Sequence, residues 1–347
     1  MRSLALVVAV VAVAAACTPP ASGGGTGGGP VTNWAFNPKA TDPAIANDAV
    51  FTHLAWAPTG TARGRLAVLF HGTGANPQAL TELAGALRAD GYHVIALRYS
   101  AALGTTGACP DSNAATDPDC HRTFRAETVF GENVEDPDGV ARNHPLVSIN
   151  ASNSVLNRLE KAVEYLRGIA PTAGWEQFQQ RDAGGACVVP DTTYGTCALR
   201  ADRLVLVGHS QGAGVALYLS KFLAVDRVAM LSGSYDGYNL GGGTYSAAPW
   251  LTDGPPATTA DRVGTLLHTS DFGLGLFRTV ENAIGVTGPE VSVTANSPPY
   301  GGSRRLITST ASTCPFDGTP AHQSTAVDLC TPDGLYAAAW RYLAGSS

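Results

Sequence analysis

Short, continuous apolar runs divide most of this chain into regular segments. The runs lie at 51–56, 66–70, 92–97, 203–207, 227–231, 263–268 and 304–308. A short apolar run without alternation is typical of a strand that is buried on both faces of a sheet. Helices are predicted between and after these runs, at 79–89, 152–169 and 332–343. Strands that alternate with helices predict an α/β fold, with a mostly parallel sheet covered on both faces.

The first 30 residues differ in composition from the rest. Residues 1–17 open with one Arg, continue as Ala, Val and Leu, and end at Cys17. This run is short for a membrane span and typical of a secretory signal, and its Ala-Ala-Ala-Cys ending resembles a bacterial lipobox with Cys17 lipidated. Residues 18–30 are rich in Gly and Pro and predict a flexible tether. We expect a chain that is exported and lipid-anchored to the cell envelope, with a secreted protein as the alternative.

The remaining residues, 31–347, have the size of one large α/β domain. The formal net charge is −6, and the sequence contains no basic cluster. A nucleic-acid partner is therefore not expected, because neutralising phosphates requires basic side chains. A second apolar run long enough for a bilayer is also missing from the sequence, so we expect membrane contact only through the N-terminal anchor.

The cysteine count fits an oxidising compartment. Of seven cysteines, six remain once Cys17 is set aside, and an even number suits disulfide bonds. Proximity along the chain favours three local pairs over free or metal-bound thiols, since the spacings do not resemble a zinc site. The pairs are Cys109 with Cys120, Cys187 with Cys197, and Cys314 with Cys330.

The pentapeptide 208–212, Gly-His-Ser-Gln-Gly, directly follows the run at 203–207. The next residues, 213–219, are predicted to begin a helix. This context places Ser210 on a sharp turn between a strand and a helix, with its hydroxyl above the sheet edge. Gly208 and Gly212 allow such a turn because they have no side chains, which at these flanking positions would collide with the neighbouring chain. The flanking elements, more than the Gly-x-Ser-x-Gly pattern itself, indicate a serine nucleophile.

A serine hydroxyl becomes nucleophilic when an imidazole accepts its proton and a carboxylate orients that imidazole. In chains with this turn the order is Ser, acid, His. His322 lies between the last predicted strand and the last helix and is the expected base, whereas His268 lies within a predicted strand. The expected acid is Asp271, just beyond the strand at 263–268.

Three other aspartates are alternatives for the acid. Asp236 follows the preceding predicted strand and is the main rival, and Asp317 and Asp328 are the others. The expected pair of Cys314 and Cys330 encloses His322, which would hold the base in place and reduce the entropy lost on reaching a reactive geometry.

Acyl transfer also needs fixed hydrogen-bond donors for the oxyanion of its tetrahedral intermediate. One donor is expected from the backbone N–H of Gln211, at the start of the helix after Ser210. The other is expected from the tetrapeptide 71–74, His-Gly-Thr-Gly, which resembles an HGGG-type loop. The N–H of Thr73 is favoured, with Gly74 as the alternative, and His71 is expected to order the loop.

Two polar segments, 100–150 and 175–200, interrupt the alternation of strands and helices. Each contains one of the expected cysteine pairs, and loops of this length are usually functional or covalently held. We expect both to be loop insertions stapled by disulfides, with the first near the active-site face as a partial lid.

From about residue 50 to its end, the chain resembles the α/β-hydrolase superfamily. The matching residues are the loop 71–74, the pentapeptide 208–212, Asp271 and His322, in the family's order. The resemblance implies an eight-stranded, mostly parallel sheet flanked by helices, a Ser–His–Asp triad and no cofactor or metal. The segments 268–271 and 321–324 also resemble a little-characterised bacterial subgroup, which implies no substrate.

Esterases and lipases dominate this architecture, so we expect hydrolysis of a carboxylic ester through an acyl-enzyme. The ester could belong to a small molecule, a lipid or a polyester. A peptidase or amidase on the same triad is one alternative. A catalytically silent binding protein is another, although binding alone would not require a serine, an acid and a histidine in this order.

Overall fold

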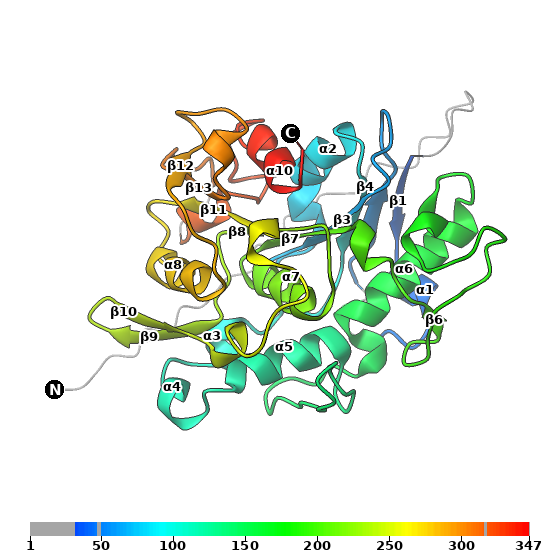
Figure 1. Ribbon diagram of the computed structural model, residues 1–347, viewed down its shortest axis with the longest axis horizontal. Coiled ribbons are helices and arrows are strands. Elements are labelled where there is room, and N and C mark those ends of the chain that lie inside the picture. The colour runs from blue at the N-terminus through cyan, green and yellow to red at the C-terminus, as the bar shows by residue number, and fades with distance from the viewer. Residues whose placement is uncertain (1–31, 47–49, 316–317, 347) are drawn as a thin grey trace. The chain divides into compact units, whose positions relative to one another are not determined.

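The computed structural model describes residues 32–46, 50–315 and 318–346 (Figure 1). The expected signal segment, Cys17 and the tether lie outside the described residues. The main sheet of the described chain has nine strands. In spatial order they are β1 (Asn33–Phe36), β2 (His53–Trp56), β4 (His93–Leu97), β3 (Leu66–Phe70), β7 (Leu204–His209), β8 (Arg227–Leu231), β11 (Val263–His268), β13 (Arg305–Thr308) and β12 (Glu290–Ser292).

The sheet is mostly parallel, as the sequence predicts. Strands β4, β3, β7, β8, β11, β13 and β12 run in one direction, whereas β2 is antiparallel to both β4 and β1. Every residue of β3, β4, β7 and β11 is buried, which explains their continuous apolar runs. The strand order and direction define an α/β-hydrolase fold.

The sheet has one strand more than the eight that the resemblance implies. The strands missing from the sequence prediction are β1 and β12, which lie at the two edges of the sheet. Both are short and carry partly exposed residues, so they lack the apolar run that marks a buried strand.

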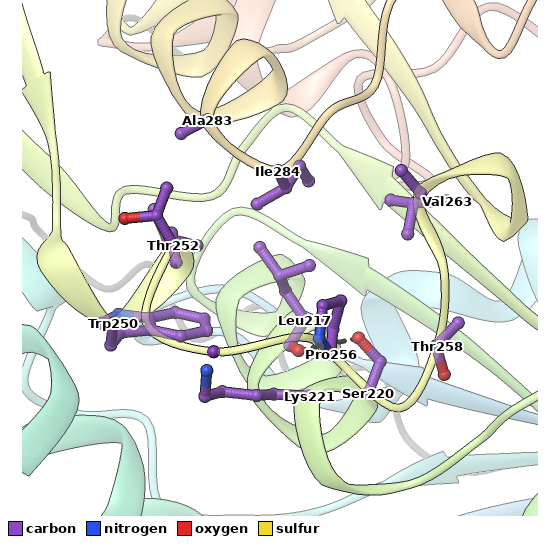
Figure 2. A pocket seen from close by; sticks show the side chains of 13 residues that line it. Leu217, Ser220, Lys221, Trp250, Thr252, Pro256, Thr258, Val263, Ala283 and Ile284 are labelled. Carbon is purple, nitrogen blue, oxygen red and sulfur yellow. Dashed lines mark hydrogen bonds between the residues drawn. The ribbon is translucent and has the colours of Figure 1, made fainter.

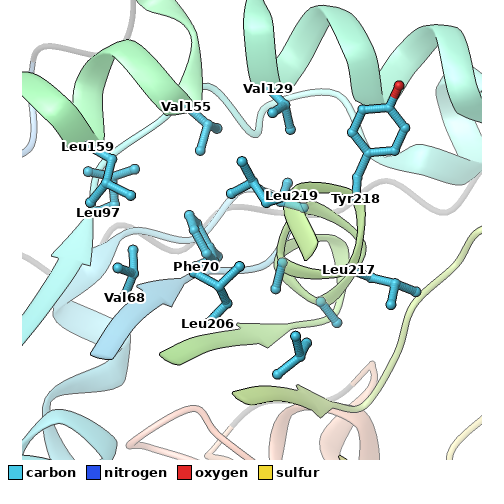
Figure 3. Packing of buried hydrophobic residues seen from close by; sticks show 14 of the residues in the cluster. Val68, Phe70, Leu97, Val129, Val155, Leu159, Leu206, Leu217, Tyr218 and Leu219 are labelled. Carbon is cyan, nitrogen blue, oxygen red and sulfur yellow. The ribbon is translucent and has the colours of Figure 1, made fainter. Parts of the chain in front are cut away.

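Helices cover both faces of the sheet, and the alternation of side chains along each strand assigns the two faces. The helices are α1 (Pro38–Thr41), α2 (Thr81–Ala89), α3 (Thr105–Ala108), α4 (Asn113–Thr116), α5 (Cys120–Phe130), α6 (Val155–Ile169), α7 (Gln211–Phe222), α8 (Leu274–Ala283), α9 (Pro320–Gln323) and α10 (Ala337–Leu343). One face packs Ala67 and Leu69 of β3 against α2 and α10. The other packs Val68 and Phe70 against α5, α6 and α7 (Figure 3).

Two small hairpins lie outside the main sheet. They are β5 (Pro190–Asp191) with β6 (Thr196–Cys197), and β9 (Gly237–Gly241) with β10 (Thr244–Ala247). The first belongs to the 175–200 segment, which otherwise contains a short 3₁₀ helix at Trp175–Phe178 and irregular chain, as the sequence predicts for an insertion.

The prediction of a loop for 100–150 is wrong in its first half, because this segment contains α3, α4 and α5. Helix α5 is buried along nearly its whole length, with Arg125 and Glu127 inside the protein. The carboxylate of Glu127 accepts backbone hydrogen bonds from His144 and Ile149. The polar sequence of this segment includes charged side chains that are buried in α5 and have hydrogen-bond partners. Helix α5 is therefore part of the core rather than a lid.

Helix ends differ slightly from the predicted ranges. A short 3₁₀ helix at Pro77–Leu80 precedes α2, and α6 begins at Val155 after the cap Ser154. The last helix, predicted from 332, begins at Ala337. Within the described residues, no helix combines the length and the apolar composition that a bilayer span requires.

The three predicted disulfide pairs are confirmed: Cys109–Cys120, Cys187–Cys197 and Cys314–Cys330. The first joins the end of α3 to the first residue of α5, and both of its cysteines are buried beside Phe124. This bond therefore fixes the start of the helix that the sequence did not predict.

Removal of that disulfide tests its contribution to stability. We expect the double substitution Cys109→Ala and Cys120→Ala to lower the free energy of unfolding by about 3 kcal/mol. Without the bond, a loop that was closed in the unfolded chain opens, and the unfolded state gains conformational entropy. Urea denaturation measures this change. The pair Cys187→Ala and Cys197→Ala closes a loop of similar length and serves as the comparison; an unchanged urea midpoint for the first pair would contradict the prediction.

Candidate active site

Ser210 occupies a strained turn between β7 and α7. Its φ of 56° and ψ of −119° lie in the positive-φ region that residues other than Gly rarely adopt. Two glycines make this turn possible by close approach. A Cβ on Gly208 would lie 2.1 Å from the backbone O of Gly212, and one on Gly212 would lie 2.2 Å from the backbone O of Phe70. The pentapeptide therefore forms the strand–turn–helix geometry that its sequence predicts.

The structure brings together the three side chains that the sequence singled out. His322, on α9, lies with Nε2 2.8 Å from Oγ of Ser210. Its Nδ1 lies 2.9 Å from Oδ2 of Asp271, just beyond β11. All three residues are buried, and Ser210 keeps 8% of its surface exposed. This arrangement allows a proton to pass from the hydroxyl to the imidazole, with the carboxylate holding the ring in orientation.

Asp271 is held by a second hydrogen bond, since its Oδ1 accepts from the backbone N–H of Gly273 at 2.9 Å. Burial acts to raise the pKa of Asp271, but the hydrogen bond and charge of His322, together with the hydrogen bond from Gly273 and one from Ser232, lower the pKa below its ordinary value. The carboxylate is therefore ionised at neutral pH, as an orienting group for an imidazole must be.

The alternative acids lie elsewhere or outside the described residues. Asp236 is fully buried and forms an ion pair with Arg125, with oxygen-to-nitrogen distances of 2.9 and 2.8 Å. Asp328 accepts hydrogen bonds from the backbone N–H groups of Thr81 and Glu82 at the start of α2. Asp317 lies outside the described residues. Of the described alternatives, each has a structural task away from His322.

His209, the neighbour of Ser210, contacts the loop that carries His322. Its Nε2 lies 3.1 Å from the backbone O of His322, which makes Nε2–H the donor. Burial, with the nearby His322, lowers the pKa of His209 to about 3, so its ring is neutral. The sequence alone does not indicate this role for His209, although the residue is the first variable position of the pentapeptide.

The 71–74 loop lies against the start of α7. Oγ1 of Thr73 donates to Oε1 of Gln211 at 2.6 Å, which joins the two residues expected to supply oxyanion donors. The N–H of Gly74 donates to the backbone O of Ala101, so it is already occupied. Within the described chain the N–H of Thr73 donates no hydrogen bond, and that of Gln211, the first residue of α7, has no partner in its helix. Both groups are free to bind an anion.

His71 is buried within the same loop and does not contact Ser210 through a hydrogen bond. Its ring stacks on Tyr99 at 4.5 Å, and the hydroxyl of Tyr99 donates to the backbone O of His71. Burial lowers the pKa of His71 to about 3, so the ring is neutral. These contacts hold His71 in the 71–74 loop, in agreement with its predicted role of ordering that loop.

Arg125 links the inserted helix α5 to the turn of Ser210. Besides its ion pair with Asp236, its guanidinium donates to the backbone O of Gln211 at 3.0 Å and to Oγ1 of Thr105 at 3.1 Å. Gly214 makes room for it, because a Cβ there would lie 2.0 Å from Arg125. The sequence does not single out Arg125, since nothing in a polar segment marks which Arg becomes buried.

Two other features lie away from Ser210. A cavity of about 250 Å³ is lined by Leu217, Trp250 and Ile284 among others, along the second half of α7, roughly 10–17 Å from Ser210 by the helical rise (Figure 2). In the described chain, the group with the spacing of metal ligands is Cys109, Cys120 and His144, and its two sulfurs are joined in a disulfide.

The sequence matches no family model and no curated protein. Among solved structures it is similar to TT1662 from Thermus thermophilus, with 14% identity, coverage of 80% of this chain and 88% of that chain, and a TM-score of 0.35. It is also similar to the apo form of Thermogutta terrifontis esterase 2, with 10% identity, coverage of 81% and 84%, and a TM-score of 0.36. These likenesses are distant, and the strand order and the Ser210 turn of this chain define its fold.

Substitution of Arg125 tests the buried ion pair. We expect Arg125→Met to lower the free energy of unfolding at pH 7 by about 3–5 kcal/mol, because it leaves the Asp236 carboxylate buried without a cation. Urea denaturation measures the loss, and adding Asp236→Leu should recover part of it.

The same variant has a pH signature. In the wild type, burial acts to raise the pKa of Asp236, but Arg125, with smaller contributions from His121 and Ser234, lowers this pKa below its ordinary value. The pair therefore stabilises the protein above the ordinary Asp pKa of about 3.9, and this contribution is lost as pH falls through the lowered pKa. The difference between wild type and Arg125→Met should shrink as pH falls below about 4; a constant difference would contradict the role of the ion pair.

Proposed function

We propose that this chain is a serine hydrolase that cleaves carboxylic esters. The observation that carries the proposal is the pair of hydrogen-bond distances that joins Ser210, His322 and Asp271, 2.8 and 2.9 Å. The strained turn at Ser210 and the free N–H groups of Thr73 and Gln211 support it, because acyl transfer needs a presented nucleophile and an oxyanion site.

The reaction begins with attack by Ser210. As Oγ bonds to the ester carbonyl carbon, its proton passes to Nε2 of His322, and the carbonyl oxygen becomes an oxyanion held by the N–H groups of Thr73 and Gln211. The bond from carbon to the alcohol oxygen then breaks, and His322 returns the proton to that oxygen. Asp271 stabilises the transient imidazolium throughout.

The acyl-enzyme is then hydrolysed by the same groups. Water gives a proton to His322 and attacks the acyl carbon, and the bond to Oγ breaks as His322 returns the proton to Ser210. The carboxylic acid leaves, and the site is restored. Each step uses groups of this chain and water alone.

We further propose that the protein acts outside the cytoplasm, anchored by a lipid on Cys17. Three disulfides support an oxidising compartment, because cytosolic proteins keep their thiols reduced. The lipobox-like sequence before Cys17 supports the anchor. Growth with a radiolabelled fatty acid, comparing wild type with Cys17→Ala, tests it; equal labelling of both would contradict the anchor.

Removal of the nucleophile tests the reaction class. We expect wild type to hydrolyse p-nitrophenyl esters of short acids with a burst of p-nitrophenol, and Ser210→Ala to lower kcat by about 10⁴-fold or more. Stopped-flow absorbance measures both. Amide turnover as fast as ester turnover would favour a peptidase or amidase instead, and no turnover of either would favour a binding protein.

Parallel substitution of the aspartates tests the acid. Asp271→Asn should lower kcat by about 10⁴-fold, since an amide cannot orient or stabilise the imidazolium in the same way. Asp328→Asn, at the carboxylate that accepts hydrogen bonds from the start of α2, is the matched control and should retain the wild-type rate. A larger loss of kcat in folded Asp236→Asn than in Asp271→Asn would mean that Asp236, and not Asp271, is the acid.

A further inference from the structure

Three aromatic rings surround His322, and we call them the aromatic cluster: Tyr235, Phe272 and Phe277. Their ring centroids lie 5.6, 5.4 and 6.1 Å from that of the imidazole. Tyr235 and Phe277 are buried, whereas Phe272 is 64% exposed. The cluster therefore joins the expected base to an apolar surface that faces solvent.

The exposed ring of Phe272 packs against a buried ring of the aromatic cluster. Its ring stacks on that of Tyr235 at 5.9 Å with an angle of 28° between planes, and Tyr235 packs edge-on against Phe277 at 4.8 Å. Complete burial of a Phe side chain stabilises a fold by about 1.5–3 kcal/mol, most of which this exposed ring does not supply. Its position beside the base points to a role in binding.

The backbone around Phe272 is fixed by the acid itself. The N–H of Gly273 donates to Oδ1 of Asp271, and the N–H of Leu274 donates to the backbone O of Asp271. The turn that orients the carboxylate therefore also sets the place of the ring. A ring held in advance loses little conformational entropy when a ligand packs on it.

The chemistry of the site decides which part of an ester lies near this ring. The carbonyl oxygen points toward the N–H groups of Thr73 and Gln211, while the alcohol oxygen must come within about 3 Å of Nε2 of His322 to receive its proton. The aromatic cluster borders His322, so the group attached to the alcohol oxygen is the part that can reach Phe272.

We propose that Phe272, supported by Tyr235, is the binding platform for the alcohol part of the substrate. This inference rests on the proposed ester hydrolysis and names its substrate class: esters of alcohols that carry a flat, apolar group such as an aromatic ring. A flat group stacks on an aromatic ring, or meets it edge to face, better than a branched or saturated group of similar size.

The test compares three esters of one acid: benzyl, cyclohexylmethyl and methyl butyrate. All three give the same acyl-enzyme, so differences in kcat/KM arise before the alcohol leaves. The alcohols have similar basicity, which separates binding from leaving-group reactivity. The wild type should prefer the benzyl ester over both others.

Substitution of the ring should remove that preference. We expect Phe272→Ala to lower the ratio of kcat/KM for benzyl over methyl butyrate by about tenfold, and Phe272→Tyr to retain most of it. Ile169→Ala, at the exposed end of α6, is the matched control and should leave the ratio unchanged. An unaltered ratio in Phe272→Ala, or a wild type without preference for the benzyl ester, overturns the proposal.

The outcomes separate this proposal from the proposed function. If Phe272→Ala lowers turnover of all three esters equally while Ser210→Ala abolishes it, the platform is wrong and the esterase stands. If wild type cleaves none of the esters and Ser210 is not labelled by a fluorophosphonate, both are wrong.

Discussion

The strained turn at Ser210 determines where the other groups of the candidate site must lie. A positive φ at a residue with a side chain persists only where surrounding contacts determine it. Here β7 lies between β3 and β8 in the sheet, and the backbone of Gly212 passes against that of Phe70. The hydroxyl is thereby presented at the edge of the sheet. The proposed base, acid and oxyanion donors come from loops and helix starts at that edge.

Contacts from remote segments hold those loops. His209 fixes the backbone of His322, Thr73 binds the side chain of Gln211, and Arg125 binds its backbone oxygen. The Arg125 pair with Asp236 is fully buried, an arrangement that contributes little net stability but is costly to break. The inserted helix α5 is thus joined to the nucleophile turn, and the 100–150 segment has a structural part in the site.

The sequence predicts the parts of this protein that follow from local pattern. Continuous apolar runs predict the buried strands, and the context of Ser210 predicts its turn. The chain order predicts the places of Asp271 and His322. Local proximity also predicts the three disulfides, since each closes a short loop.

What the sequence does not predict depends on long-range pairing. Edge strands such as β12 take their shape from a neighbouring strand and not from their own three residues. Helix α5 has a polar sequence although it is buried, because its charged side chains find partners elsewhere in the fold, such as Asp236 for Arg125. Phe272 is an ordinary apolar residue in the sequence, and its place beside His322 emerges only when the loops meet.

The candidate site can act only if the hydroxyl of Ser210 is reactive in the folded protein, and intact-protein mass spectrometry after treatment with a fluorophosphonate measures that reactivity. We expect a single adduct on folded protein, mapped by proteolysis to Ser210, and no adduct when the protein is unfolded in urea before treatment. An adduct on another serine, or equal labelling of folded and unfolded protein, would contradict it.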